Sequence, residues 1–139
     1  MRHLIDFVLK GAAHLGSAFA LSAFGAGSVL AAPDPEVVES LAGADVVILG
    51  EIHDNAAHHQ MQAELLAELS PKAVVWEMIT PEQASGLNLM QMSDAIAVAK
   101  QLGWANSGWP EFAIYAPVFA AAQGARQFGG QVPRAVAGE

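Results

Sequence analysis

The chain has no cysteine and few basic residues. Without cysteine, neither a disulfide bond nor a lipid-modified cysteine can hold the protein in place. Only six of its 139 residues are lysine or arginine, against fourteen aspartates and glutamates, and the cations form no cluster. A protein with so few cations is a poor candidate for binding the phosphates of nucleic acid or for docking on anionic lipid. The absences exclude a disulfide scaffold and disfavour these two classes of partner.

The first 32 residues have the pattern of an export signal. A positively charged start is followed by the uncharged stretch LGSAFALSAFGAGSVL and then by small residues suited to cleavage. The stretch is rich in glycine, alanine and serine and shorter than the roughly 20 apolar residues that cross a bilayer, which disfavours a membrane anchor. We predict a signal peptide at residues 1–32, cleaved near Ala31 or Ala32, and a periplasmic or secreted domain at 33–139. That domain carries a net charge of about −9.

Two apolar runs predict neighbouring parallel strands. Residues 44–50 (ADVVILG) and 72–78 (KAVVWEM) are rich in β-branched and aliphatic side chains, as in strands buried on both faces. Between them, Asn55 can cap a helix over residues 56–69. A strand, a helix and a strand in this order form a βαβ unit with a right-handed crossover. We expect an α/β fold with a parallel sheet, helices on both faces and an incomplete set of strands.

The rest of the chain predicts three helices and one short strand. A capping box at Thr80–Gln83 begins the first of these helices. Ser93 can cap the second, over residues 94–102. The third begins near Pro110, a residue suited to the first helical position, and carries a stripe of aromatic side chains. A short strand near Gln131 is the last element that the pattern indicates.

The histidines are concentrated in one place. Outside the predicted leader, all three, His53, His58 and His59, lie within seven residues that follow the first predicted strand. Histidine is the commonest metal ligand and is the side chain that titrates near neutrality without perturbation. Beside Glu51 and Asp54, this cluster indicates a loop that holds a ligand or carries out chemistry. The alternative is that His53 only ties the loop together or caps the following helix.

A second carboxylate belongs to the same predicted edge. Glu51 follows the first strand and Glu77 closes the second, and the carboxyl ends of parallel strands, about 4.8 Å apart, meet at the edge where such sheets bind ligands. We therefore expect Glu51, His53, Asp54 and Glu77 to converge on one crevice. Because these side chains come from two strand ends, the topology of the sheet would bring them together.

His58 and His59 are predicted to differ in role. Adjacent helical residues point about 100° apart, so both cannot easily face one ion. His58 shares a helix face with Met61 and Leu65, which makes it the better candidate ligand, and His59 is expected nearer the surface. The spacing of His53 and His58 matches no standard zinc motif on a helix, so the identity of any divalent metal stays open.

Four sequence blocks resemble a known family. They are ILGEIHDNAAHHQMQAELL, AVVWEMITPEQ, SGWPEFAIYAPVFAAA and VPR, in this order between residues 44 and 134. Together they resemble the haem-binding ChaN-like proteins, relatives of the Tiki and erythromycin-esterase group. The resemblance implies an exported protein of iron and haem acquisition that binds haem or another tetrapyrrole. Domains of that family look about twice as long, so we expect an N-terminal fragment, and the lack of a cysteine at the leader junction implies a soluble form.

The resemblance also implies a ligand. Tyr115 is the only tyrosine, and a phenolate can serve as an axial ligand of haem iron. In the family, haem is held through tyrosine at a subunit contact, which implies a possible homodimer. From the sequence pattern alone, Tyr115 is an aromatic core residue, because Phe112 and Phe119 share its stripe. Five further side chains are predicted either to line an apolar pocket or to belong to the core: Trp104, Trp109, Met78, Met90 and Met92.

The sequence favours two functions, and a nonfunctional truncated chain is the third interpretation. The first is a haem-binding protein whose ligands come from His53, His58 and Tyr115. The second is a hydrolase, with or without a metal, in which Glu51 and His53 activate water and Glu77 is the partner acid or base. The resemblance favours binding over catalysis.

Overall fold

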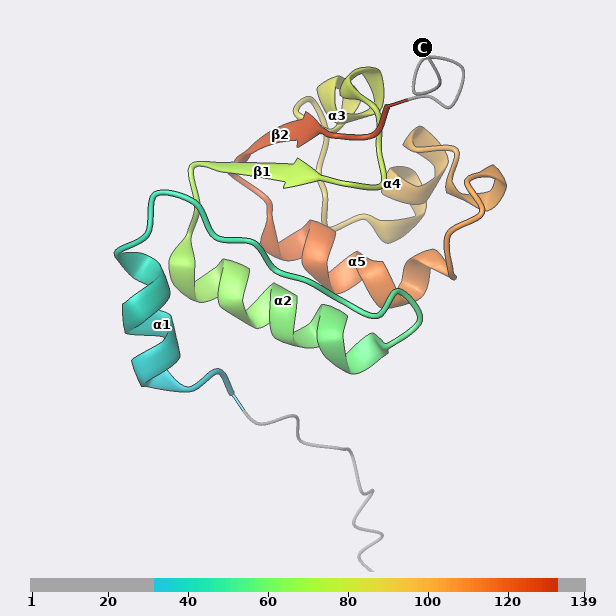
Figure 1. Ribbon diagram of the computed structural model, residues 1–139. Helices are drawn as coiled ribbons and strands as arrows, with labels where there is room; N and C mark the ends of the chain where they lie inside the picture. Colours follow the sequence, from blue (N-terminus) through green and yellow to red (C-terminus); the bar gives the residue numbers. More distant parts are fainter. Residues whose placement is uncertain (1–31, 133–139) are drawn as a thin grey trace, which may run out of the picture.

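The computed structural model describes residues 32–132, so nearly all of the predicted signal peptide lies outside the described residues (Figure 1). The elements, in chain order, are α1 (Pro35–Ala42), α2 (Ala56–Leu69), β1 (Ala73–Trp76), α3 (Pro81–Leu87), α4 (Ala95–Gln101), the 3-10 turn η1 (Trp104–Asn106), α5 (Phe112–Ala121) and β2 (Arg126–Gly129). No helix within this described part is long and apolar enough to cross a membrane.

Side-chain caps set the starts of α2 and α3, as the sequence predicts. The Asn55 side chain accepts a hydrogen bond from the amide of Ala57 at 3.0 Å and begins α2. At α3, the Thr80 hydroxyl accepts from the amide of Gln83, and the Gln83 side chain accepts from the amide of Thr80. Because these caps are local, they could be predicted from short stretches of sequence.

The starts of α4 and α5 each lie later than predicted. Asp94, not Ser93, caps α4, because its carboxylate accepts the amide of the third residue beyond it. Helix α5 begins at Phe112 instead of Pro110. The Pro110 carbonyl accepts a hydrogen bond from the Trp104 indole at 2.7 Å, which holds this proline in the loop before the helix.

β1 and β2 form a parallel two-stranded sheet, with Ala73 opposite Arg126 and Trp76 opposite Gly129. This confirms the α/β class and the parallel sheet, and so small a sheet agrees with the expected incomplete set of strands. The predicted strand at residues 72–78 is confirmed as β1. The strand expected near Gln131 lies instead at β2, where the alternation was hard to recognise because the buried central residue is a glutamine.

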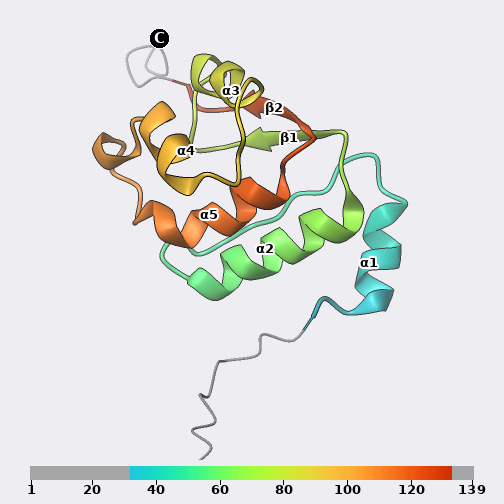
Figure 2. The same cartoon turned by 180° about the vertical axis from the view of Figure 1, so that it is seen from behind.

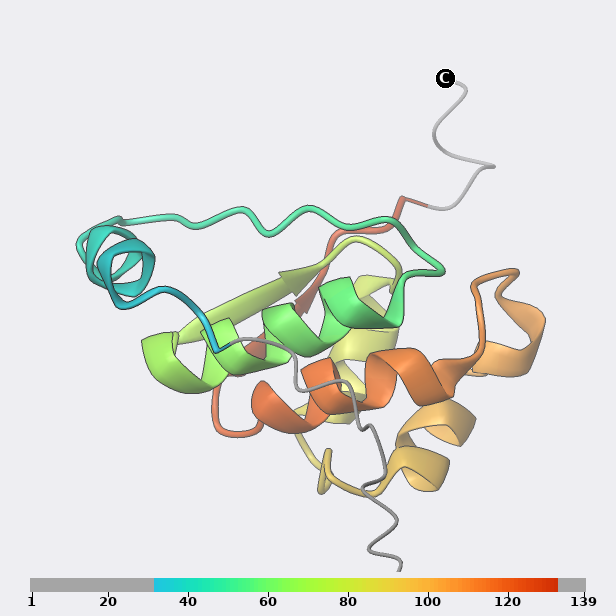
Figure 3. The same cartoon turned by 90° about the horizontal axis from the view of Figure 1, so that it is seen from below.

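Residues 44–50 are extended but form no strand. Figure 1 shows this segment running beside β1 in the same direction, yet β2 is the strand paired with β1. Val46 is 79% exposed and Ile48 is 90% exposed, so the prediction of a strand buried on both faces is wrong, as is the pairing in the predicted βαβ unit. Figure 3 shows α2 and α5 on one side of this layer, and Val75 and Phe128 are exposed on its other side. We expected helices on both faces, and within residues 32–132 α2 and α5 cover one of them.

The core lies between the sheet and the helices behind it. Helices α2 and α5 pack side by side, as both Figure 1 and the reverse view in Figure 2 show. The Trp76 and Phe119 rings stack with their centroids 4.1 Å apart, and Trp104 meets the Phe119 ring edge-on. These contacts join β1 to α5 and to η1, so the end of β1 is fixed relative to both.

A buried glutamine joins the two strands to the loops around them. Gln127 is 3% exposed. Its side-chain oxygen accepts from the Trp76 indole at 2.7 Å, and its side-chain nitrogen donates to the backbone carbonyls of Ala122 and Ala125. The Asn88 side chain bonds to both the backbone N–H and the backbone carbonyl of Gln127. Asn88 thereby occupies the hydrogen-bonding positions that a third strand would use at this residue.

Replacing Gln127 by leucine should destabilise the fold. The change nearly keeps the volume but removes the partner of the buried Trp76 indole N–H and of the Ala125 carbonyl, whereas the Ala122 carbonyl still accepts from the amide of Ala125. The free energy of unfolding should therefore fall by about 3 kcal/mol. Urea unfolding followed by tryptophan fluorescence measures it. Gln91→Ala, at an exposed side chain, is the control and should change the value by less than about 0.5 kcal/mol. Equal stability of wild type and Gln127→Leu would show that these bonds contribute nothing net.

Candidate functional site

Glu51 lies at the centre of the histidine cluster. Its Oε1 is 3.1 Å from Nδ1 of His53, and its Oε2 is 3.0 Å from Nδ1 of His59. The Glu51 side chain is only 10% exposed, and a carboxylate so enclosed is stable only when it is paired. The two histidines supply that pairing, so Glu51 links the loop before α2 to the helix itself.

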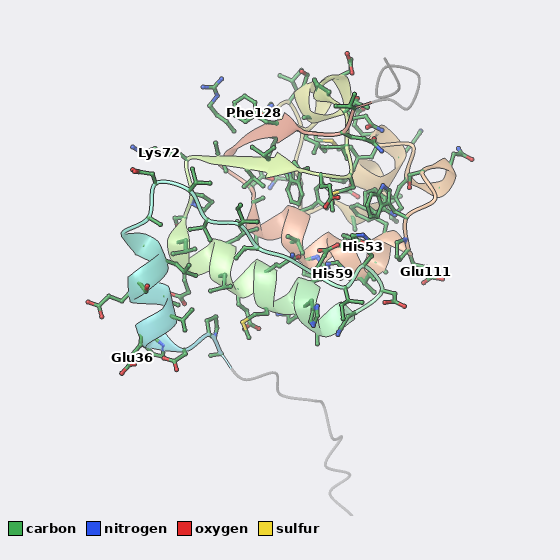
Figure 4. The ribbon with its side chains drawn as sticks, in the orientation of Figure 1. Glu36, His53, His59, Lys72, Glu111 and Phe128 are labelled. Atoms are coloured by element: carbon green, nitrogen blue, oxygen red, sulfur yellow. The ribbon has the colours of Figure 1, made fainter. Side chains whose placement is uncertain are left out.

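His53 presents its outer nitrogen to solvent. The side chain is 49% exposed, Nδ1 faces Glu51, and the ring meets the Trp109 ring edge-on with centroids 4.7 Å apart. Within residues 32–132, no polar atom of the protein bonds to Nε2 of His53. Figure 4 shows His53 and His59 close together, far from Lys72 at the start of β1. His53 therefore combines a held inner nitrogen with an accessible outer one.

The burial of His58 and His59 is the reverse of what the sequence predicted. His59 is fully buried, whereas His58 is half-buried and its Nδ1 accepts the backbone N–H of Ile52 at 2.9 Å. The expectation that His59 lies nearer the surface is wrong. Helix α2 buries His59 together with Ala63 and Leu66, which lie four and seven residues further on, against the side where α5 packs. This spacing was present in the sequence and could have identified His59.

Tyr115 is part of the core beneath the loop. It is 1% exposed, its hydroxyl donates to the backbone carbonyl of His53 at 2.9 Å, and its ring lies 4.1 Å from that of His59. Burial, followed by the negative charge of Glu51, raises the pKa of the phenol, with smaller contributions from two further carboxylates. An iron-ligating tyrosine must lose its proton, so this position favours the aromatic-core interpretation of Tyr115.

The other predicted carboxylates lie around this cluster without joining it. Asp54 and Glu77 are exposed, and neither side chain bonds to His53 in the described part of the chain. Both are near enough for their charges to contribute to the raised pKa of Tyr115. Among the described residues, no group of three histidine or carboxylate side chains is arranged to hold a metal ion.

The aromatic and sulfur side chains expected near a pocket mostly form the core. Met92 and Trp104 are buried in the central cluster, and Met78 and Met90 pack against it. Trp109 alone of this set contacts the ring of a histidine in the site. Apolar surface next to His53 therefore comes from Trp109 and from the exposed side chain of Ile52.

Tyr115 should ionise only at high pH. Because it is the only tyrosine, an alkaline absorbance titration reports it alone, and its transition should lie above that of the urea-unfolded chain, which is near pH 10. The folded state holds the phenolic proton more tightly, so this contribution to stability is present below about pH 10 and is lost as the pH rises through the folded-state pKa. Glu51→Gln should lower the transition by removing a neighbouring charge. Coincident folded and unfolded titrations would contradict the buried position of the phenol.

Comparison with known proteins gives one match. The profile of a family described as haem-binding uptake, Tiki superfamily, ChaN, matches residues 37–139, a span that includes Glu51, His53, His59 and Tyr115. Neither the curated proteins nor the solved structures contain a match to the chain. The match covers well over half of the sequence and confirms the resemblance seen in the four blocks. The chain belongs to the haem-binding uptake family of ChaN, in the Tiki superfamily.

Proposed function

We propose that the protein binds haem and that His53 is the ligand of the haem iron. The observation that carries the proposal is the Glu51–His53 pair, in which one ring nitrogen is tied to a carboxylate and the other is accessible. Histidines that bind metals usually donate their second nitrogen to a carboxylate or carbonyl, which fixes the ring and raises its basicity. The family match supports haem as the group that is bound.

The surroundings of His53 suit a flat apolar ligand. Ile52 is 60% exposed directly before His53, and the Trp109 ring contacts the imidazole. Haem, when bound, would supply an iron that accepts a protein ligand, and His53 would hold that iron through its outer nitrogen, with the Glu51 carboxylate behind the ring to raise its basicity.

His53 is preferred to the other two predicted ligands on the basis of their contacts. The His58 ring is held by the amide of Ile52, a bond that fixes the loop before α2. The Tyr115 hydroxyl is buried and already donates to a backbone carbonyl. Among the three, His53 therefore needs the least rearrangement to reach an external ligand.

We also propose that the protein is exported and takes part in iron or haem acquisition. The apolar leader with its small-residue cleavage site supports delivery to the periplasm or beyond. The lack of cysteine at the leader junction supports a soluble mature protein instead of a lipid-anchored one. A homodimer with haem at the contact is supported by the family resemblance alone.

Titration of the purified protein with hemin tests the ligand. Saturable binding should appear as a shift of the Soret band, and His53→Ala should weaken the affinity by about tenfold or more because the ligand is lost. Tyr115→Phe and His58→Ala should each retain a saturable Soret shift and lose less affinity than His53→Ala, because each removes a hydrogen bond that supports the loop and leaves the ligand in place. Loss of binding in Tyr115→Phe with binding kept in His53→Ala would make the tyrosine the ligand. A folded wild type without any saturable change would refute haem binding.

A hydrolase remains the second candidate, because the same pair can act on water. A carboxylate that orients an imidazole is the arrangement by which a histidine serves as a general base. Glu77 is exposed near the site and is the available partner acid or base. Glu77→Gln should abolish turnover of a hydrolysable substrate but weaken haem binding only modestly, which separates the two functions.

A further inference from the structure

His59 is a buried side chain whose ring nitrogens both face acceptors. Its Nε2 lies 3.0 Å from the backbone carbonyl oxygen of His53, an atom that can only accept. Its Nδ1 lies 3.0 Å from Oε2 of Glu51 and 3.3 Å from the side-chain oxygen of Gln62. The orientation of the Gln62 amide is set independently, because its nitrogen donates to the carbonyl of Leu49. The buried ring therefore contacts Glu51 through one nitrogen and the backbone of His53 through the other.

This arrangement determines what Glu51 can do. The contact with His59 holds Oε2, and an ionised carboxylate only accepts hydrogen bonds at either oxygen. At Oε1, its only partner in the described part of the chain is Nδ1 of His53, at 3.1 Å. The proton of a neutral His53 ring must then lie on Nδ1, which leaves the lone pair on the exposed Nε2.

We propose that His59 is a positioning residue that, through Glu51, fixes the tautomer of His53 and so leaves Nε2 of His53 free to accept a ligand. The last step, in which that ligand is the iron of haem, rests on the proposed function, whereas the hydrogen-bond relay does not. His59 also holds the backbone of His53 through its carbonyl, so one buried ring sets both the position and the tautomer of the exposed one.

The contacts predict opposite tautomers for His53 and His58. A neutral His53 ring carries its proton on Nδ1, because Nδ1 faces the Glu51 carboxylate. A neutral His58 ring carries its proton on Nε2, because its Nδ1 accepts from the amide of Ile52, a bond that does not involve His59. His58 is therefore an internal reference. Without the relay, His53 would populate both tautomers, as an exposed histidine does in water.

Long-range 1H–15N spectra of the full chain without haem read these states directly. The rings of His3 and His14 are told apart from the cluster by single His→Gln substitutions. We expect these two tautomers in the wild type, and in His59→Leu we expect His53 to populate both forms while His58 is unchanged. Hemin affinity should fall about 10- to 100-fold in His59→Leu, the usual loss when a group behind a metal ligand is removed. Gln60→Ala, on the same turn of α2 and bonded only to Glu64, is the control and should change neither reading.

The outcomes separate this proposal from haem binding itself. If the wild type shows the predicted tautomers, His59→Leu mixes those of His53 and hemin does not bind, the relay stands and the proposed ligand is wrong. If hemin binds but His53 has the same tautomer in His59→Leu as in the wild type, the relay is wrong. Should His59→Leu not fold, the wild-type spectrum still decides, because a His53 ring that carries its proton on Nε2, or that populates both tautomers, overturns the proposal.

Discussion

The contact on which the site depends is the one between the Glu51 carboxylate and two imidazoles. Glu51 lies in the loop before α2, His53 two residues later in that loop, and His59 one turn into the helix. Because the carboxylate is almost enclosed, it cannot be left unpaired without a cost of several kcal/mol. Within residues 32–132, the segment 44–50 that precedes this loop pairs with no strand, so no backbone ladder holds the loop. The pairing of Glu51 with the two histidines stabilises it instead.

The loop is also tied to a distant part of the chain. The His53 carbonyl accepts from two buried donors, Nε2 of His59 on α2 and the Tyr115 hydroxyl on α5. These helices pack against each other, and the stacked pair of Trp76 and Phe119 joins α5 to β1. The position of one exposed imidazole thus depends on the hydrophobic core, through two polar side chains that the core encloses. Such support holds the imidazole of His53 in place from behind.

The parts of this fold that the sequence predicted are those set by local chemistry. The caps at Asn55 and Thr80 need only neighbouring residues, and the apolar run around β1 is buried wherever a helix covers it. Burial of residues 44–50 needed a second covering layer, and an apolar pattern reports that a segment favours burial without showing that a cover is present. β2 was missed because Gln127 is buried through its hydrogen bonds, and periodicity of apolar residues does not register such a position.

The assignment of the histidines shows the same limit at the site. His58 and His59 differ by one position on a helix, and only the packing of α2 on α5 decides which of them is enclosed. Once His59 is enclosed, its two nitrogens need hydrogen-bond partners, and the carboxylate and the carbonyl that provide them both belong to the loop carrying His53. Satisfying the buried ring and arranging the exposed imidazole of His53 are therefore a single constraint. An apolar side chain in place of His59 would remove the first requirement and lose the arrangement that follows from it.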